Sequence, residues 1–269
     1  MSNLLGYGAL FGLSTAAFYK FLTRKVFDRN AVPQEPPSTS IVMCSLNEEG
    51  FVEDALKSLE DQNVRICFPD KFECILIDSH SEDRTVEIAE EYGWTVYQAE
   101  RGKLNARHLG MLKAKGDIIV SVDADTFYAP NWLNLMLRWF NNNSVVAVAG
   151  PRIVNPEENM LATGLSIWMS LIDTGPLVIG GMRAPGQSVA FYRQAYFDIG
   201  GWDLSIDQLN QHSMVVEEEI KFAVKLRRLG RMPVAWDAPC FTSIRRVAFL
   251  GKGEKYRKFT KERFSGQRF

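Results

Sequence analysis

Short apolar runs alternate with segments of helical spacing over the first half of the chain. Apolar, β-branched runs at Ser40–Leu46, Phe72–Ser79 and Asp117–Asp125 have the length and composition of buried strands. The segments between them predict the helices Glu49–Gln62, Asp83–Tyr92 and Lys103–Lys115, and a short strand at Thr95–Glu100. This alternation favours right-handed crossovers. It therefore predicts a Rossmann-like α/β fold, with a mostly parallel sheet flanked by helices.

The second half of the chain is less regular. A helix at Trp132–Phe140 and a strand at Ser144–Val154 are followed by a helix around 161–172 and a strand at Gln187–Arg193. The amphipathic segment Val216–Gly230 predicts a helix that its glycine ends. We therefore expect two halves, 40–150 and 151–244, followed by a basic tail at 245–269.

The N-terminus carries an apolar run, Leu4–Leu22, whose one charged residue is Lys20. Roughly 20 apolar residues span a bilayer, and the basic residues that follow place the remaining chain on the cytoplasmic side. The alternative, indicated by the glycines and small residues in the run, is a helix that lies on the membrane or packs on the domain. We expect residues 1–30 to form a membrane-associated helix, and the proline-rich residues 31–39 to form a linker.

Charge, cysteine spacing and missing loop motifs argue against a nucleic-acid partner, a zinc site and a dinucleotide or P-loop site. The 31 Lys and Arg residues nearly balance the 32 Asp and Glu residues, so net charge gives no reason to expect a nucleic-acid partner. The four cysteines and three histidines lack metal-binding spacings, which favours free thiols in a reducing compartment. No glycine-rich dinucleotide or phosphate loop is present in the sequence.

Polar side chains follow three of the predicted strands, at the points where the strands end. Asn47 and Glu48 follow the first strand, Asp78 ends the second, and Asp123 and Asp125 end a later one. In open α/β sheets, ligands bind beyond the carboxyl ends of the strands. We therefore expect these side chains to converge on one site.

Asp123 and Asp125 lie two positions apart, so on an extended chain they point to the same side, about 6–7 Å apart. Two carboxylates at a buried strand end need a compensating cation, and Mg²⁺ is commonly held by one or two carboxylates plus substrate phosphates. The pair indicates a divalent cation with a diphosphate ligand. The alternative is that one aspartate caps the next helix and the other is solvated. Lys103 and Arg107, four residues apart, fit either phosphate contact or a solvated basic face.

Five ordered motifs carry a resemblance to a known family: SIVMCSLNEE, ILIDSHSEDRT, GKLNARHLGMLKAKGDIIVSVDADT, GQSVAFYRQAYFDIGGWD and EEEIKFAVKLRRLG. Together they resemble the inverting glycosyltransferases of family 2, over about residues 38–246. The resemblance implies a GT-A fold, a nucleoside-diphosphate-sugar donor and a divalent cation, Mn²⁺ or Mg²⁺. It places Asp123 near the ribose or the metal, makes Asp125 the principal metal ligand, and puts five residues around the nucleoside: Leu46, Asn47, Glu48, Asp78 and Arg107.

The resemblance also implies catalytic and acceptor residues in the second half. Inversion at an anomeric carbon needs a carboxylate that takes the acceptor proton. The family's Glu-Asp pair falls on Glu218 and Glu219, so Glu219 is the expected base, with Glu218 or Glu217 as alternatives. Without the resemblance, these residues would be read as acidic side chains that favour a helix N-terminus. Gly186, Gln187 and Ser188 are expected near the donor sugar and the acceptor, and Trp202 and Asp203 near the acceptor.

Arg245 and Arg246 are expected to neutralise the leaving diphosphate or a lipid diphosphate, and a basic segment that contacts anionic lipid is the alternative. We therefore predict a metal-dependent inverting glycosyltransferase at a membrane, with its catalytic domain facing the cytoplasm and a glycan or lipid-linked acceptor. Residues 40–150 would bind the nucleotide sugar, and residues 151–244 would bind the acceptor and carry the base. A nucleotidyltransferase and a non-catalytic nucleotide-sugar-binding protein remain the alternatives.

Overall fold

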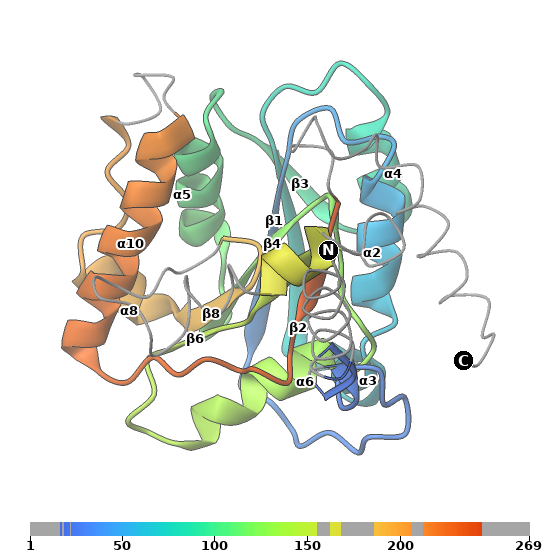
Figure 1. Ribbon diagram of the computed structural model, residues 1–269. Coiled ribbons are helices and arrows are strands. Elements are labelled where there is room, and N and C mark those ends of the chain that lie inside the picture. Colours follow the sequence, from blue (N-terminus) through green and yellow to red (C-terminus); the bar gives the residue numbers. More distant parts are fainter. Residues whose placement is uncertain are drawn as a thin grey trace, which may run out of the picture.

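The computed structural model describes residues 17, 19–21, 23–154, 162–167, 186–205 and 212–243, with the backbone alone for 212–217. Its main element is a six-stranded sheet in the order β3-β2-β1-β4-β8-β6 (Figure 1). The first four strands of that order are parallel, and β8 runs antiparallel to both of its neighbours. The predicted α/β architecture with a mostly parallel sheet is therefore confirmed. The strands are β1 (Thr39–Ser45), β2 (Phe72–Asp78), β3 (Thr95–Gln98), β4 (Ile118–Asp123), β6 (Ala147–Ala149) and β8 (Val189–Tyr192).

Helices cover both faces of this sheet. α2 (Val52–Glu60) and α4 (Thr85–Glu91) lie on one face, and α5 (Lys103–Lys113) and α10 (His212–Leu229) lie on the other (Figure 1). The strands supply both layers because their side chains alternate: Ile41 and Met43 join one hydrophobic cluster, and Val42 joins the other. Shorter elements complete the described fold: α3 (Asn63–Cys67), η1 (Pro69–Lys71), α6 (Trp132–Leu137), η2 (Arg138–Asn141) and α8 (Arg193–Asp198).

α5 packs very close to the sheet. A Cβ at Gly110, in the middle of this helix, would lie 2.3 Å from Cγ1 of Val42 on β1. The missing side chain at this position therefore sets the distance between helix and strand. As a result, the N-terminal turn of α5 lies beside the carboxyl ends of β1 and β4.

A second, three-stranded sheet has the order β5-β9-β7, with β5 (Thr126–Phe127), β9 (Cys240–Thr242) and β7 (Arg152–Val154). The single strand expected at 144–154 is wrong, since its two halves form β6 and β7 in different sheets. Pro151 lies between them and has no N–H for a ladder, while the Gly150 N–H donates to Ser188 O at 2.8 Å. The segment that forms β9 is three residues long and was not predicted to be a strand.

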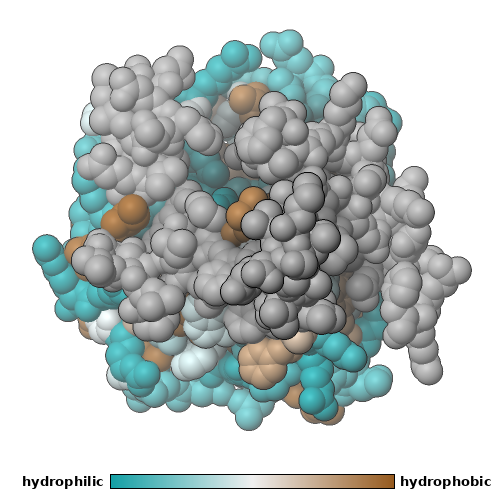
Figure 2. All heavy atoms as spheres, in the orientation of Figure 1, coloured by the Kyte–Doolittle hydropathy of each residue, from teal (hydrophilic) through white to brown (hydrophobic). Residues whose placement is uncertain are grey.

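The expected N-terminal membrane helix falls mostly outside the described residues. Of the part of the chain that the structure describes, no helix is long and apolar enough to cross a bilayer. On the face shown in Figure 2, the hydrophobic residues among the coloured atoms form separate spots between hydrophilic regions. Membrane association therefore remains a prediction.

Candidate functional site

The carboxyl ends of β1, β2 and β4 lie side by side. In the register of the sheet, Ser45 on β1 pairs with Asp78 on β2, and Cys44 pairs with Asp123 on β4. The polar residues at the three strand ends therefore meet at one edge of the sheet. Six carboxylate side chains are buried among the described residues, four at or just after the ends of these strands and two on α10 (His212–Leu229): Glu48, Asp78, Asp123, Asp125, Glu218 and Glu219.

Asp78 organises the loop that follows β2. Its side chain is fully buried and accepts hydrogen bonds from Ser45 Oγ at 3.1 Å, from the Ser81 N–H at 2.8 Å and from Ser81 Oγ at 2.5 Å. These three donors fix the loop, so Asp78 shapes the edge of the expected nucleoside pocket.

The loop after β1 is held against the loop after β2. The Asn47 N–H donates to Ser81 Oγ at 2.8 Å, and Asn47 Oδ1 accepts the Glu82 N–H at 2.8 Å. Asn47 and His80 both have a left-handed backbone, with φ of 54° and 63°. The Glu48 N–H donates to Thr85 Oγ1 at 2.7 Å, which links the same loop to the start of α4, and Leu46 is exposed.

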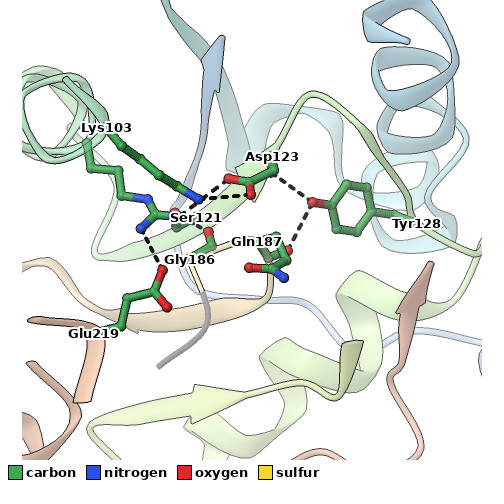
Figure 3. A network of polar contacts seen from close by, with 8 residues as sticks. Lys103, Ser121, Asp123, Tyr128, Gly186, Gln187 and Glu219 are labelled. Carbon is green, nitrogen blue, oxygen red and sulfur yellow. Dashed lines mark hydrogen bonds and ion pairs between the residues drawn. The ribbon is translucent and has the colours of Figure 1, made fainter. Parts of the chain in front are cut away.

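Asp123 is the centre of a charged network (Figure 3). Lys103 Nζ lies 3.4 Å from its Oδ2, and a guanidinium nitrogen of Arg107 lies 3.4 Å from its Oδ1. Its N–H donates to the Tyr128 hydroxyl at 3.0 Å, and that hydroxyl donates to the Gln187 carbonyl at 3.0 Å. Lys103 and Arg107 are one turn apart on α5, so the helix presents two cations to the end of β4.

Arg107 joins this network to α10. Its side chain is 1% exposed, and its second terminal nitrogen donates to Oε1 of Glu219 at 3.0 Å, where the Glu219 side chain is 2% exposed. Burial disfavours the charge on the guanidinium, but Asp123 and Glu219 outweigh this effect and raise the pKa of Arg107 above its ordinary value. Arg107 and Glu219 therefore form a buried ion pair at the site.

Gly186 lies directly against this arginine. A Cβ at Gly186 would lie 1.5 Å from a terminal nitrogen of Arg107, so a side chain there is incompatible with the observed guanidinium position. The Gly186 carbonyl accepts a hydrogen bond of 2.6 Å from Ser121 Oγ, on the face of β4 that also carries Asp123. Gln187 and Ser188, which follow Gly186, are both buried.

The residues expected near the acceptor lie beside α10. Oε1 of Glu218 accepts the Asp203 N–H at 3.0 Å, and its Oε2 is buried without a hydrogen-bond partner in the described part of the chain. Trp202 is buried and stacks on Phe222, with ring centroids 3.8 Å apart, so it packs in the core. The Asp203 side chain is exposed and accepts a hydrogen bond of 2.6 Å from Ser205 Oγ. Arg245, Arg246 and the side chain of Glu217 lie outside the described residues.

The charge balance of this edge fits a bound cation. Against the six buried carboxylates, Arg107 is the one buried Lys or Arg side chain among the described residues. Within the same residues, no three His, Cys, Asp or Glu side chains are gathered around one point, so the protein alone does not present a complete metal site. Because Mg²⁺ usually takes one or two carboxylates and completes its shell with water and substrate phosphates, Asp125 and Asp123 fit this kind of binding.

Sequence reasoning missed two residues of the network. Tyr128 bridges Asp123 to Gln187, and nothing in its spacing indicates that role. Ser121 is a polar residue inside the apolar run of β4, two positions before Asp123. That placement was a usable signal, because residues two apart on a strand share a face.

Comparisons with known proteins identify the family and the fold that this chain resembles. The model of the family described as glycosyl transferase family 2 matches residues 40–198. The chain is 34% identical over 125 residues to 4,4'-diaponeurosporenoate glycosyltransferase of Staphylococcus haemolyticus, covering 42% of this chain and 32% of that protein. It is 27% identical over 261 residues to beta-monoglucosyldiacylglycerol synthase of a Nostoc species, covering 88% of this chain and 52% of that protein. The chain thus spans about half the length of the Nostoc relative and about a third of the length of the Staphylococcus relative.

The fold is also found among solved structures. The mannosyltransferase PcManGT from Pyrobaculum calidifontis, solved in complex with GDP-Man and Mn²⁺, aligns with a TM-score of 0.59 at 21% identity. The alignment covers 89% of this chain and 65% of that one. The family match ends at α8, before α10, so it does not include Glu218 and Glu219.

Proposed function

The chain belongs to glycosyl transferase family 2, and from this we propose that it is a metal-dependent, inverting glycosyltransferase. It would move a sugar from a nucleoside-diphosphate donor to an acceptor hydroxyl. One observation carries the proposal. Six carboxylates are buried at the ends of β1, β2 and β4 and on α10, against one buried arginine, and a divalent cation would offset part of this excess of negative charge.

The donor is assigned to the edge formed by β1, β2 and β4. Leu46, Asn47 and Glu48 would line the nucleoside pocket, whose shape Asp78 fixes through the loop after β2. Asp125, with Asp123, would hold the cation. When bound, that cation would supply positive charge to the departing diphosphate. Gln187 and Ser188 would border the donor sugar.

Glu219 is the proposed base. Its carboxylate would take the proton from the acceptor hydroxyl as the acceptor oxygen bonds to the anomeric carbon from the face opposite the diphosphate. The bond from that carbon to the diphosphate oxygen breaks in the same step, which inverts the configuration. The position of Glu219 supports this role, because Arg107 connects its carboxylate to Asp123 at the donor edge. Glu218 and Asp203 would contact the acceptor.

We further propose that the acceptor is membrane-presented, a lipid-linked molecule or a glycan, and that the catalytic domain faces the cytoplasm. Two features support this proposal: the apolar N-terminal run followed by basic residues, and a relative whose name describes a glycolipid synthase. Arg245 and Arg246 would contact the leaving diphosphate or a phosphate of the acceptor.

Calorimetry on the full chain tests the donor assignment. UDP, GDP, CDP and TDP are titrated with and without Mn²⁺ into the wild type, Asp125→Ala and Asp117→Ala. Asp117 is the matched control, because it is an exposed aspartate at the opposite end of β4. Metal-dependent binding of one nucleotide, lost in Asp125→Ala and kept in Asp117→Ala, is the expected result. If no nucleotide binds to the folded wild type, the donor site is wrong. If both aspartate variants bind equally well, Asp125 is not the cation ligand.

A further inference from the structure

The role of Arg107 is left open by the donor assignment. The family resemblance places this residue close to the nucleoside, yet its side chain is 1% exposed and its guanidinium lies between two carboxylates. Each terminal nitrogen of this guanidinium contacts a carboxylate. These contacts point to a role for Arg107 other than direct contact with the donor.

The two carboxylates come from distant parts of the chain. Asp123 lies at the end of β4, and Glu219 lies on α10, 112 residues from Arg107 in sequence. One terminal nitrogen of the guanidinium contacts each of them, at 3.4 Å and 3.0 Å. Because a guanidinium is planar and rigid, its two contacts fix the direction of one carboxylate relative to the other.

The surroundings hold the guanidinium in this position. Gly186 packs directly against the guanidinium, since a Cβ at Gly186 would lie 1.5 Å from a terminal nitrogen. The Ser121 hydroxyl bonds to the Gly186 carbonyl and so fixes the glycine against Arg107. The arginine is thus fixed on both sides, by carboxylates and by backbone.

We propose that Arg107 is a positioning residue, which holds the Glu219 carboxylate in its reactive orientation and ties it to Asp123 at the donor edge. This inference rests on the proposed function of Glu219 as the base. It assigns Arg107 to the catalytic step and removes it from nucleotide recognition. Turnover and nucleotide affinity should therefore respond differently when Arg107 is changed.

Arg107→Met tests whether turnover and nucleotide affinity respond differently to the loss of Arg107. We expect kcat to fall by about 100-fold, the size of effect that a misplaced catalytic group produces. The Kd of the nucleotide should change by no more than about threefold, since on this model Arg107 does not contact it. Arg107→Lys should recover part of kcat, because an ammonium supplies the charge but not both directed contacts.

The assay uses the full chain with Mn²⁺ and two readouts. Nucleotide Kd is measured by calorimetry, and kcat is measured as release of nucleoside diphosphate from UDP-glucose, UDP-N-acetylglucosamine or GDP-mannose, according to which nucleotide binds. Arg65→Met is the matched control. It removes a partly buried arginine that pairs with Glu60 at 2.9 Å, away from the site, and it should leave both readouts at the wild-type value.

Glu219→Gln provides the second test. If Arg107 acts through Glu219, adding Arg107→Met to Glu219→Gln should lower the residual turnover no further, because the group being positioned is already lost. The double variant also removes both charges of the Arg107–Glu219 pair, so it provides a folded protein for the binding measurement if Arg107→Met alone does not fold.

The outcomes separate this inference from the proposed function. If Glu219→Gln turns over like the wild type, Glu219 is not the base and the positioning role of Arg107 is wrong, while the glycosyltransferase assignment stands. If Glu219→Gln is inactive but Arg107→Met keeps kcat and binds nucleotide at least about tenfold more weakly, the base stands and Arg107 is a nucleotide ligand. The same conclusion follows if the double variant loses nucleotide binding while Glu219→Gln alone retains it.

Discussion

Removing the charge of Arg107 should cost far more stability than removing the charge of an exposed arginine with the same kind of partner. Arg107 pairs with Glu219 at 3.0 Å, with side chains 1% and 2% exposed. Arg84 pairs with Glu87 at 2.8 Å, with side chains 58% and 56% exposed. The two ion pairs are similar in length and differ in burial and in the second carboxylate, Asp123, that Arg107 contacts.

The expected loss of unfolding free energy is much larger for Arg107→Met than for Arg84→Met. Arg107→Met leaves the Glu219 carboxylate buried without the cation that pairs with it, which typically costs about 3–5 kcal/mol. Asp123 keeps Lys103 at 3.4 Å, so the loss is concentrated at Glu219. Arg84→Met breaks an exposed helical pair, and pairs of this kind often contribute nothing measurable to stability. Because domains are stable by about 5–15 kcal/mol in total, the first variant should lose a large share of the stability.

Urea unfolding followed by circular dichroism at pH 7 measures both effects. With a slope of about 2 kcal/mol per molar urea, the midpoint should fall by about 1.5–2.5 M for Arg107→Met, and it should stay at the wild-type value for Arg84→Met. Arg107→Met/Glu219→Gln should recover much of the loss, since no uncompensated charge remains. Equal midpoint shifts for the two single variants would refute the reasoning.

The loss of stability in Arg107→Met should depend on pH. In Arg107→Met, burial without a cation should raise the pKa of the Glu219 carboxyl above its unfolded value. The penalty is therefore fully present well above that raised pKa. It shrinks as the pH falls, and it is gone below the unfolded pKa of a glutamate, about 4.3. A penalty that is the same at pH 4 and pH 8 would mean that the loss comes from packing.

Two further predictions concern packing and thiol chemistry. Gly110→Ala should destabilise the protein by about 1–3 kcal/mol in urea unfolding, because the new Cβ would lie 2.3 Å from Val42 Cγ1. This overpacking should outweigh the gain in helix propensity, roughly 1 kcal/mol. An unchanged or raised urea midpoint would show that α5 moves away from the sheet at no cost. Iodoacetamide at pH 8 should modify the exposed Cys67 first, as read by mass spectrometry of the native protein. Burial raises the pKa of the Cys44, Cys74 and Cys240 thiols to about 12, so each is ionised to about one part in ten thousand at pH 8. Equal labelling of all four cysteines would contradict this prediction.

The sequence determined the layered architecture because the signals for it are local. The apolar runs at β1, β2 and β4, with amphipathic segments between them, are readable within windows of about ten residues. The polar residues at the strand ends followed from the same pattern, since parallel strands place their carboxyl ends at one edge. The strand expected at 144–154 was wrong because the break at Pro151 depends on which partner strands are available, and these lie far along the chain.

The tertiary structure alone decided how the charged groups are paired. Asp123, Asp125 and Glu219 were each candidates from sequence, but the Arg107–Glu219 contact joins residues 112 positions apart. No periodicity encodes such a pair. It depends on the close approach of α5 to the sheet at Gly110, on the space left by Gly186 and on the docking of α10 against the same face. Residue types, local spacing and the family resemblance thus gave the candidate groups of the site, whereas long-range packing determined which of them share the buried positive charge of Arg107.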